Sequence, residues 1–229
     1  MRKGRRELKK FFYKNASRLF ATQGIVLVIL QYILLRRLHI QLLAFHLFYL
    51  LLVGLIQIVG GVILGRAIRL LYIRANTDFL TGLYTRAVFY DHLNAKSSEK
   101  MCLLVLDVDD FKLVNDYYGH LAGDKVLVAL AKLLHNEVRR EDIVARIGGE
   151  EFAIILADTS LEEAILIGER IKNRVHETVF PYQGKYLSIS VGISNMGTCN
   201  SAERMFQLAD DALYRAKEKR NYVEIIECI

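Results

Sequence analysis

Two groups of acidic residues follow short apolar runs, an arrangement in which paired carboxylates can act together. The run 101–106 is a buried-strand pattern that ends at Asp107. Further along, a Gly-Gly pair precedes Glu150 and Glu151 between two apolar runs, as expected for the tip of a β-hairpin. If the two strands lie side by side, their carboxylates converge on one divalent cation, and oxygen ligands of this kind suit Mg²⁺. The arrangement indicates nucleotidyl or phosphoryl transfer.

Each motif alone also has an ordinary structural explanation, because Gly-Gly is common in hairpin turns and acidic residues are common at exposed tips. The residues after Asp107 favour the functional interpretation. They include, in this order, Asp109, Phe111, Lys112, Asn115, Asp116, Gly119, His120, Gly123 and Asp124. With this pattern the chain resembles the GGDEF family of diguanylate cyclases, whose signature reads GGEEF at 148–152. The resemblance runs from about Asn76 to the C-terminus, since 78–83 and 209–217 are also family-like.

The resemblance implies a reaction in which two GTP molecules condense into cyclic di-GMP and release two pyrophosphates. It implies that Asp107, Glu150 and the backbone carbonyl of Val108 bind Mg²⁺, with Mn²⁺ as an alternative. Glu150 is the candidate to accept the proton of the attacking 3′-hydroxyl, and Glu151 is the third catalytic candidate. Because each domain would bind one GTP, two domains must face each other, so the resemblance implies a homodimer.

The resemblance also implies a set of residues that bind GTP. The predicted substrate-binding residues are Asn115, His120, Asp124, Gly148, Gly149, Lys217 and Arg220. A carboxylate and an amide suit the hydrogen-bonding edge of guanine, and a glycine pair lets phosphates approach the backbone. Spacing alone equally allows Asn115 as a turn residue and Asp124 as a helix cap. Around Arg220 the chain departs from the family, because this motif is one residue shorter and lacks a glycine, which leaves the register of Arg220 open.

An Arg-x-x-Asp pattern, Arg139 to Asp142, ends six positions before Gly148. In the GGDEF family this is the site where cyclic di-GMP inhibits its own synthesis. A guanidinium can bind a phosphate or stack on guanine, and a carboxylate can accept from the guanine edge. We therefore predict a product-binding inhibitory site at Arg139 and Asp142, with Arg170 contributing from the next helix. A charged helix end that matches by chance is the alternative.

The positive charge of the chain is confined to its first third. The formal net charge is +6, but the residues up to Arg74 include thirteen Lys or Arg and one Asp or Glu, a balance of +12. The remainder has eighteen basic and twenty-four acidic residues, a balance of −6. This asymmetry argues against nucleic-acid binding by the domain that carries the motifs and predicts no nucleic-acid partner.

The same first third contains apolar runs at 19–35 and 40–65, separated by a short segment with Arg36 and Arg37. A membrane helix needs about 20 apolar residues, which the second run satisfies, while the first is marginal. Basic residues outside both runs predict a multi-pass hairpin in the inner (cell) membrane with both ends in the cytoplasm. Because Arg36 and Arg37 would lie on the other side, one span with an interfacial segment remains an alternative. Glutamines and glycines within the runs suit packing inside the chain, between subunits or against a membrane-protein sensor partner.

These observations divide the chain into four parts. They are a basic cytoplasmic N-terminus (1–18), a transmembrane hairpin (19–65), a linker (66–77) and a GGDEF catalytic domain (78–229). The last part alternates strand and helix patterns, with a capping box at Ser160 and Glu163 and an alternating strand at 186–193. We expect an α/β (α+β) sandwich with a mostly antiparallel, palm-like sheet flanked by helices.

Three cysteines, Cys102, Cys199 and Cys228, have no metal-like spacing and predict reduced thiols.

Two alternatives to a membrane-anchored cyclase stay open. One is a catalytically silent GGDEF domain that binds GTP or cyclic di-GMP as a membrane-bound receptor. The other is a palm-fold cyclase that makes another cyclic nucleotide. The presence of Asp107 and Glu150 with both glycines favours the enzyme.

Overall fold

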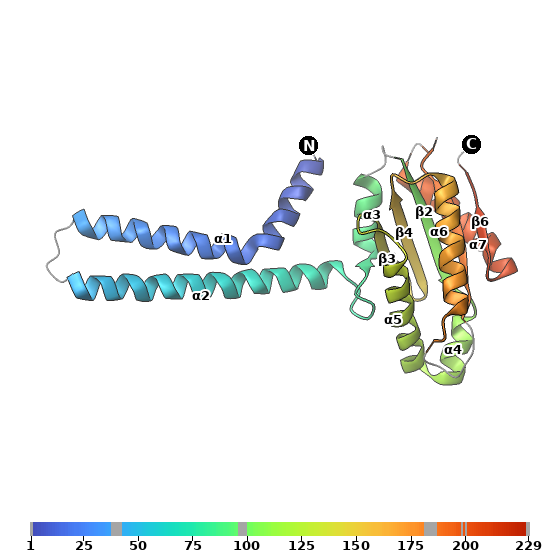
Figure 1. Ribbon diagram of the computed structural model, residues 1–229, viewed down its shortest axis with the longest axis horizontal. Helices are drawn as coiled ribbons and strands as arrows, with labels where there is room; N and C mark the ends of the chain where they lie inside the picture. Colours follow the sequence, from blue (N-terminus) through green and yellow to red (C-terminus); the bar gives the residue numbers. More distant parts are fainter. Residues whose placement is uncertain are drawn as a thin grey trace. The chain divides into compact units, whose positions relative to one another are not determined.

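The structure is a computed structural model that describes residues 2–37, 43–95, 100–180, 187–197, 199 and 201–227. The chain separates into two compact units, Met1–Ala75 and Asn76–Ile229 (Figure 1). The first unit is helical, and the second contains the sheet and the predicted site residues. Each unit is described by itself below.

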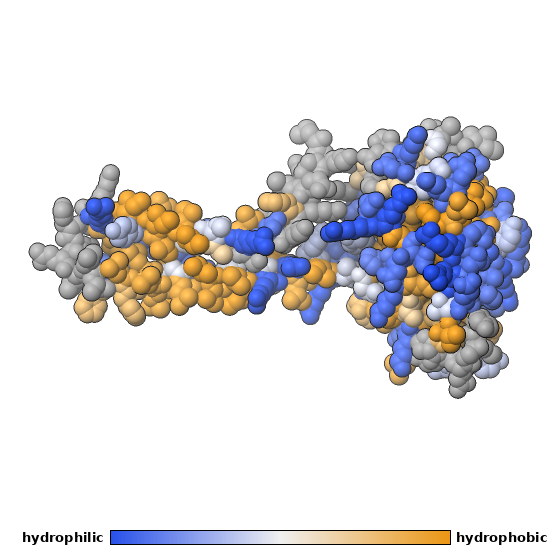
Figure 2. Space-filling view, viewed as in Figure 1, coloured by the Kyte–Doolittle hydropathy of each residue, from blue (hydrophilic) through white to orange (hydrophobic). Residues whose placement is uncertain are grey.

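The first unit consists of two long helices, α1 (Arg2–Arg37) and α2 (Leu43–Asn76). Among the described residues, the stretches Arg18–Arg36 and Phe45–Asn76 are long and apolar enough to cross a membrane, with mean hydropathies of 1.8 and 2.5. Only 6% and 11% of these stretches are buried, whereas the core helix of a soluble protein would be mostly buried. Their apolar surfaces are visible in Figure 2. Both helices are compatible with the predicted transmembrane hairpin, and 66–76, predicted as linker, continues α2.

The two helices of this unit contact each other through small residues. Gly24 lies against the backbone and Cβ of Gln57, and a Cβ added to Gly61 would meet the backbone of Phe20 at 2.9 Å. Small residues of this kind allow two apolar helices to approach closely. Gly60, by contrast, has open space where a side chain would lie. Packing inside the chain therefore accounts for Gln57 and Gly61.

The second unit is built on a six-stranded sheet with the order β1-β3-β4-β2-β5-β6. Each adjacent pair among the central strands β3, β4, β2 and β5 is antiparallel, whereas β1 pairs with β3, and β6 with β5, in parallel at the two edges. The strands are β1 (Tyr84–Thr85), β2 (Met101–Val108), β3 (Ile143–Arg146), β4 (Glu151–Ala157), β5 (Ile189–Asn195) and β6 (Val223–Ile225). The predicted mostly antiparallel sheet is confirmed.

The described part of this unit also contains five helices: α3 (Arg86–Ala95), α4 (Phe111–Tyr118), α5 (His120–Asn136), α6 (Leu161–Glu177) and α7 (Ala202–Lys219). Side chains of β2 alternate between two cores, because successive residues of a strand point to opposite faces. Leu104 and Leu106 pack in the core that contains residues of α5 and α6, whereas Leu103 and Val105 pack in the core that contains residues of α3 and α7. The same alternation assigns Asp107 to the face of α7.

Local signals set several helix ends. Ser160 accepts from the backbone of Glu163, and the Glu163 side chain accepts from the backbone of Ser160, so the predicted capping box is present. Apolar residues at helical spacing predict a helix over 123–140. Helix α5 instead begins at His120, because Gly119, with φ of +81°, separates it from α4, and it ends at Asn136.

The prediction of three reduced cysteines is wrong for Cys199. This residue is disulfide-bonded, whereas Cys102 is a free thiol. Cys102 lies in the core, and its burial raises the pKa of the thiol to about 11. Cys228 lies outside the described residues.

Candidate active site

The register of the central strands brings the predicted carboxylates to one edge of the sheet. Asp107, next to the last residue of β2, lies directly opposite Glu151, the first residue of β4. The backbone N–H of Val108 donates to the carbonyl of Glu150 at 3.4 Å. Asp107 is only 3% exposed, while Glu150 and Glu151 are half-buried. Two segments more than forty residues apart in the sequence thus place three carboxylates side by side.

A cation from a third element approaches the same carboxylates. Lys217, in the last turn of α7, places its Nζ 2.7 Å from Oδ2 of Asp107. Burial raises the pKa of Asp107 from 3.8 to about 6. Lys217 opposes this rise through its hydrogen bond and charge, and Glu150 and Glu151 add to it. The site therefore concentrates negative charge that a bound cation would neutralise.

The donors at this edge fit a magnesium ion. No group of three or more His, Cys, Asp or Glu side chains in the described part of the chain is arranged to hold a metal. Mg²⁺ does not require one, since it usually takes one or two carboxylates and completes its shell with water and substrate phosphates. Glu151 is turned toward Gly148, because a Cβ added there would collide with its carboxylate. Asp107, Glu150 and the Val108 carbonyl are the remaining donors.

The hairpin that carries Glu150 is anchored by a residue that the sequence prediction missed. Arg146, at the end of β3, donates to the carbonyl of Gly149 from Nε at 3.2 Å and from Nη2 at 2.7 Å. Its Nη1 lies 3.0 Å from Oδ1 of Asp78. Burial raises the pKa of Asp78, but hydrogen bonds from Thr81 and Arg146 outweigh it and lower the pKa overall. A basic residue two positions before the glycine pair was the available signal.

The two residues predicted to recognise guanine lie on adjacent helices. A Cβ added to Gly123 of α5 would collide with the Asn115 amide oxygen, so this amide of α4 lies over Gly123, the residue that precedes Asp124. Asp124 and His120 are exposed. At the hairpin tip, a Cβ added to Gly149 would meet nothing within 4 Å. The backbone is therefore open to a ligand there.

The loop between β2 and α4 contacts the chain after α7. Arg220 Nη1 lies 2.7 Å from Oδ2 of Asp110. Asp109, the preceding residue, accepts from the hydroxyls of Ser188 and Ser190, each at 2.7 Å. Arg220 therefore lies beside the loop that follows Asp107.

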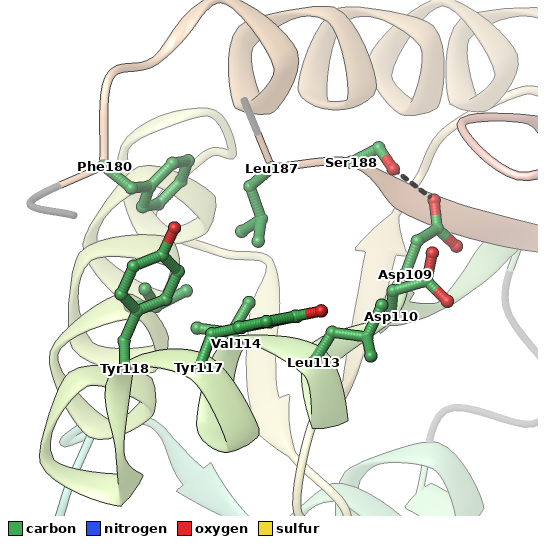
Figure 3. A pocket seen from close by; sticks show the side chains of 10 residues that line it. Asp109, Asp110, Leu113, Val114, Tyr117, Tyr118, Phe180, Leu187 and Ser188 are labelled. Atoms are coloured by element: carbon green, nitrogen blue, oxygen red, sulfur yellow. Dashed lines mark hydrogen bonds between the residues drawn. The ribbon is translucent and has the colours of Figure 1, made fainter. Parts of the chain in front are cut away.

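A cavity of about 210 Å³ lies on another face of α4. Figure 3 shows Asp109 and Asp110 at one end, and Tyr118 and Phe180 at the other. Its lining residues are Asp109, Asp110, Leu113, Val114, Tyr117, Tyr118, Val126, Phe180, Leu187 and Ser188. Because neither Asn115 nor Asp124 lines it, the cavity is separate from the predicted guanine-binding residues.

The residues of the predicted inhibitory site have internal partners. Asp142 is 8% exposed, and its two carboxylate oxygens accept from the backbone N–H groups of Arg139 at 2.8 Å and Ala157 at 3.1 Å. The Arg139 side chain is exposed. Arg170 Nε lies 2.9 Å from Oε2 of Glu137, and its Nη2 donates to the Glu137 carbonyl at 2.6 Å. The Asp142 carboxylate thus closes a turn, and both guanidinium groups lie near the surface.

Comparison with known families agrees with this geometry. The family model described as "Diguanylate cyclase, GGDEF domain" matches residues 75–222. The chain belongs to the GGDEF family. The matched residues include strands β1 to β5 and every predicted site residue, whereas β6 lies just beyond them.

Two relatives show how far this similarity extends along the chain. Diguanylate cyclase DgcP of Pseudomonas aeruginosa is 42% identical over 152 residues, which cover 63% of this chain and 23% of DgcP. An uncharacterized membrane protein of Staphylococcus saprophyticus is 39% identical, over 64% of this chain and 44% of that protein. The chain therefore aligns with less than half the length of these relatives.

Among solved structures, the coiled coil and GGDEF domain of DgcB from Caulobacter crescentus, in complex with c-di-GMP, superposes with a TM-score of 0.68 at 28% identity. The match covers 71% of this chain and 92% of the DgcB chain.

Proposed function

We propose that this protein is a diguanylate cyclase that condenses two GTP into cyclic di-GMP and two pyrophosphates. One observation carries the proposal in this chain of the GGDEF family. The buried Asp107 lies opposite Glu151 at the acidic hairpin tip, and Nζ of Lys217 lies 2.7 Å from its Oδ2. A catalytically silent domain would be expected to have lost some of these groups. The related alternative, a receptor for GTP or cyclic di-GMP, keeps the same fold but has no turnover.

In this proposal Asp107, Glu150 and the Val108 carbonyl hold Mg²⁺, with Mn²⁺ as the alternative. The bound ion supplies charge neutralisation at the reacting phosphate and lowers the pKa of the attacking hydroxyl. Glu150 accepts the proton of the 3′-hydroxyl, and Glu151, against Gly148, adds to the negative field that attracts the ion.

The remaining site residues bind the nucleotide. Lys217 and Arg220 neutralise the triphosphate, which approaches the hairpin tip of Gly148 and Gly149 at the open backbone of Gly149. Asn115 and Asp124 read the guanine edge, because an amide and a carboxylate match its donors and acceptors, while the exposed His120 lies at the start of the same helix.

The proposal extends to assembly and location. The reaction joins two nucleotides, so the active form is a homodimer in which each subunit supplies one GTP. Helices α1 and α2 anchor the protein in the inner membrane as a multi-pass hairpin, and the basic residues of 1–18 keep the catalytic domain (78–229) in the cytoplasm. A membrane protein that acts as a sensor is the partner that would control this dimer.

The proposal also includes inhibition of the enzyme by its product, cyclic di-GMP. Arg139 and Arg170 are exposed cations, able to bind the phosphates of cyclic di-GMP. Asp142, whose carboxylate already accepts two backbone hydrogen bonds, orients Arg139. Arg139→Ala should raise the steady-state level of product, and unchanged inhibition by added cyclic di-GMP would contradict the site.

The activity is tested on the full chain in detergent micelles, incubated with GTP and MgCl₂ and followed by chromatography of the products. We expect cyclic di-GMP from the wild type and none from Asp107→Asn or Glu150→Gln. The matched control is Asp211→Asn, an exposed acidic residue of α7, which should keep full activity. A demonstrably dimeric wild-type sample that binds GTP but yields no cyclic dinucleotide would reject the enzyme and favour the receptor.

A further inference from the structure

We propose that Asp110 is a positioning residue that holds Arg220 in the orientation needed to bind the triphosphate. The inference rests on the proposed function, because it assigns a role toward the substrate of the same site. It starts from the ion pair between Asp110 Oδ2 and Arg220 Nη1, which are 2.7 Å apart. The pair joins the loop after β2 to the chain after α7, two segments separated by more than one hundred residues.

The backbone around Arg220 is set in an uncommon conformation. Helix α7 ends at Lys219, and Arg220 and Asn221 follow with φ of +57° and +45°, a region that favours glycine. A specific contact holds this turn, because the backbone N–H of Asn221 donates to Oδ2 of Asp109 at 2.9 Å. Asp109 is itself fixed by two serine hydroxyls. The turn that replaces the shortened family motif is therefore fastened to the loop after β2.

The Asp110 side chain does not cap helix α4. It is the N-cap residue of α4, where an Asp side chain normally accepts from a backbone N–H of the first helical turn. Here its side chain makes no capping hydrogen bond, and its φ of +52° is again in the left-handed region. A capping bond is worth about 1 kcal/mol, so the local structure forgoes a common stabilising contact. The carboxylate is directed to Arg220 instead.

Two ion pairs with the same spacing join these segments. Lys217 contacts Asp107, and three residues later in both segments Arg220 contacts Asp110. The second pair is exposed, with side-chain exposures of 64% and 41%, so it adds little to stability. Its effect is orientation, because a guanidinium held through Nη1 keeps Nε and Nη2 available to phosphate oxygens.

This role predicts a selective change in nucleotide affinity. Without Asp110, Arg220 must lose more side-chain freedom when it binds the β- and γ-phosphates, so nucleoside triphosphates bind more weakly. GMP lacks the β- and γ-phosphates, so its binding affinity should not change. General damage to the loop would instead weaken both nucleotides, because both share the guanine-binding residues.

The test uses the full chain in micelles and measures equilibrium binding of 3′-deoxy-GTP and GMP with MgCl₂. 3′-Deoxy-GTP lacks the attacking hydroxyl, so it binds without condensing. We expect Asp110→Asn to weaken 3′-deoxy-GTP binding about three- to fivefold and GMP binding less than about twofold. Arg220→Gln should weaken 3′-deoxy-GTP binding about tenfold or more, and Asp110→Asn should then have no further effect. Asp211→Asn is the charge-matched control.

Equal weakening of both nucleotides by Asp110→Asn, additive effects of the two substitutions, or unchanged or tighter 3′-deoxy-GTP binding would overturn the positioning role. Failure of the proposed function has a different signature. A chain that shows the selective binding change but makes no cyclic dinucleotide keeps the role of Asp110 and loses the enzyme. A wild type that does not bind 3′-deoxy-GTP overturns both.

Discussion

The burial of Asp107 predicts that this carboxylate destabilises the metal-free catalytic domain. Its pKa is about 6 when folded and near the ordinary 3.8 when unfolded, so the folded state holds the proton more tightly. Stability therefore falls as the pH rises from 3.8 through about 6, and the full penalty applies above that range. Asp107→Asn removes the ionisation and should stabilise the domain at neutral pH.

The magnitude follows from the same shift. About 2 pKa units correspond to roughly 3 kcal/mol, a figure that already includes the opposing hydrogen bond and charge of Lys217. The expected gain is therefore up to about 3 kcal/mol, or a rise in Tm of about 6–12 °C for a domain of this size.

The assay is thermal unfolding of residues 76–229, which contain both core clusters and all the described strands, in EDTA between pH 4 and pH 8. The gain in Asp107→Asn should be small at pH 4 and grow until about pH 6.5. A variant that is no more stable than wild type at pH 8, or a gain that does not change with pH, would refute the reasoning. Asp211→Asn, an exposed change of the same charge, should leave Tm unaltered.

Three further outcomes are expected. Arg146→Met should lower the free energy of unfolding by about 1–2 kcal/mol in urea, because the half-buried Asp78 carboxylate and the Gly149 carbonyl lose their partner; an unchanged midpoint would count against this anchor. Gly123→Ala should displace the Asn115 amide and weaken 3′-deoxy-GTP binding about tenfold, while the circular dichroism spectrum stays the same. If the variant binds 3′-deoxy-GTP as tightly as the wild type, the amide is not needed at that position. Ser160→Ala should cost about 1 kcal/mol through loss of the capping box, and Ser160→Asp, which can still cap, should restore most of it.

Local patterns were enough for much of the fold. The apolar run before Asp107 and the glycine pair before Glu150 predicted β2 and the β3–β4 hairpin, because strand and turn preferences depend on neighbouring residues. The capping box at Ser160 predicted the start of α6 for the same reason. Predicted boundaries were less accurate where a tertiary contact or a single φ value decides them, as at Gly119 between α4 and α5.

The sequence by itself determined the family, the residue types of the site, the two apolar helices and the mainly antiparallel sheet, since these follow from motif order, composition and periodicity. Only the tertiary structure decided that Asp107 faces Glu151, that Arg146 joins Asp78 to the hairpin tip and that Asp110 pairs with Arg220. The physical reason is that strand order and register are set by closure of the whole sheet and by packing on both its faces. Contacts between residues 44, 68 and 110 positions apart therefore leave no local signal in the chain.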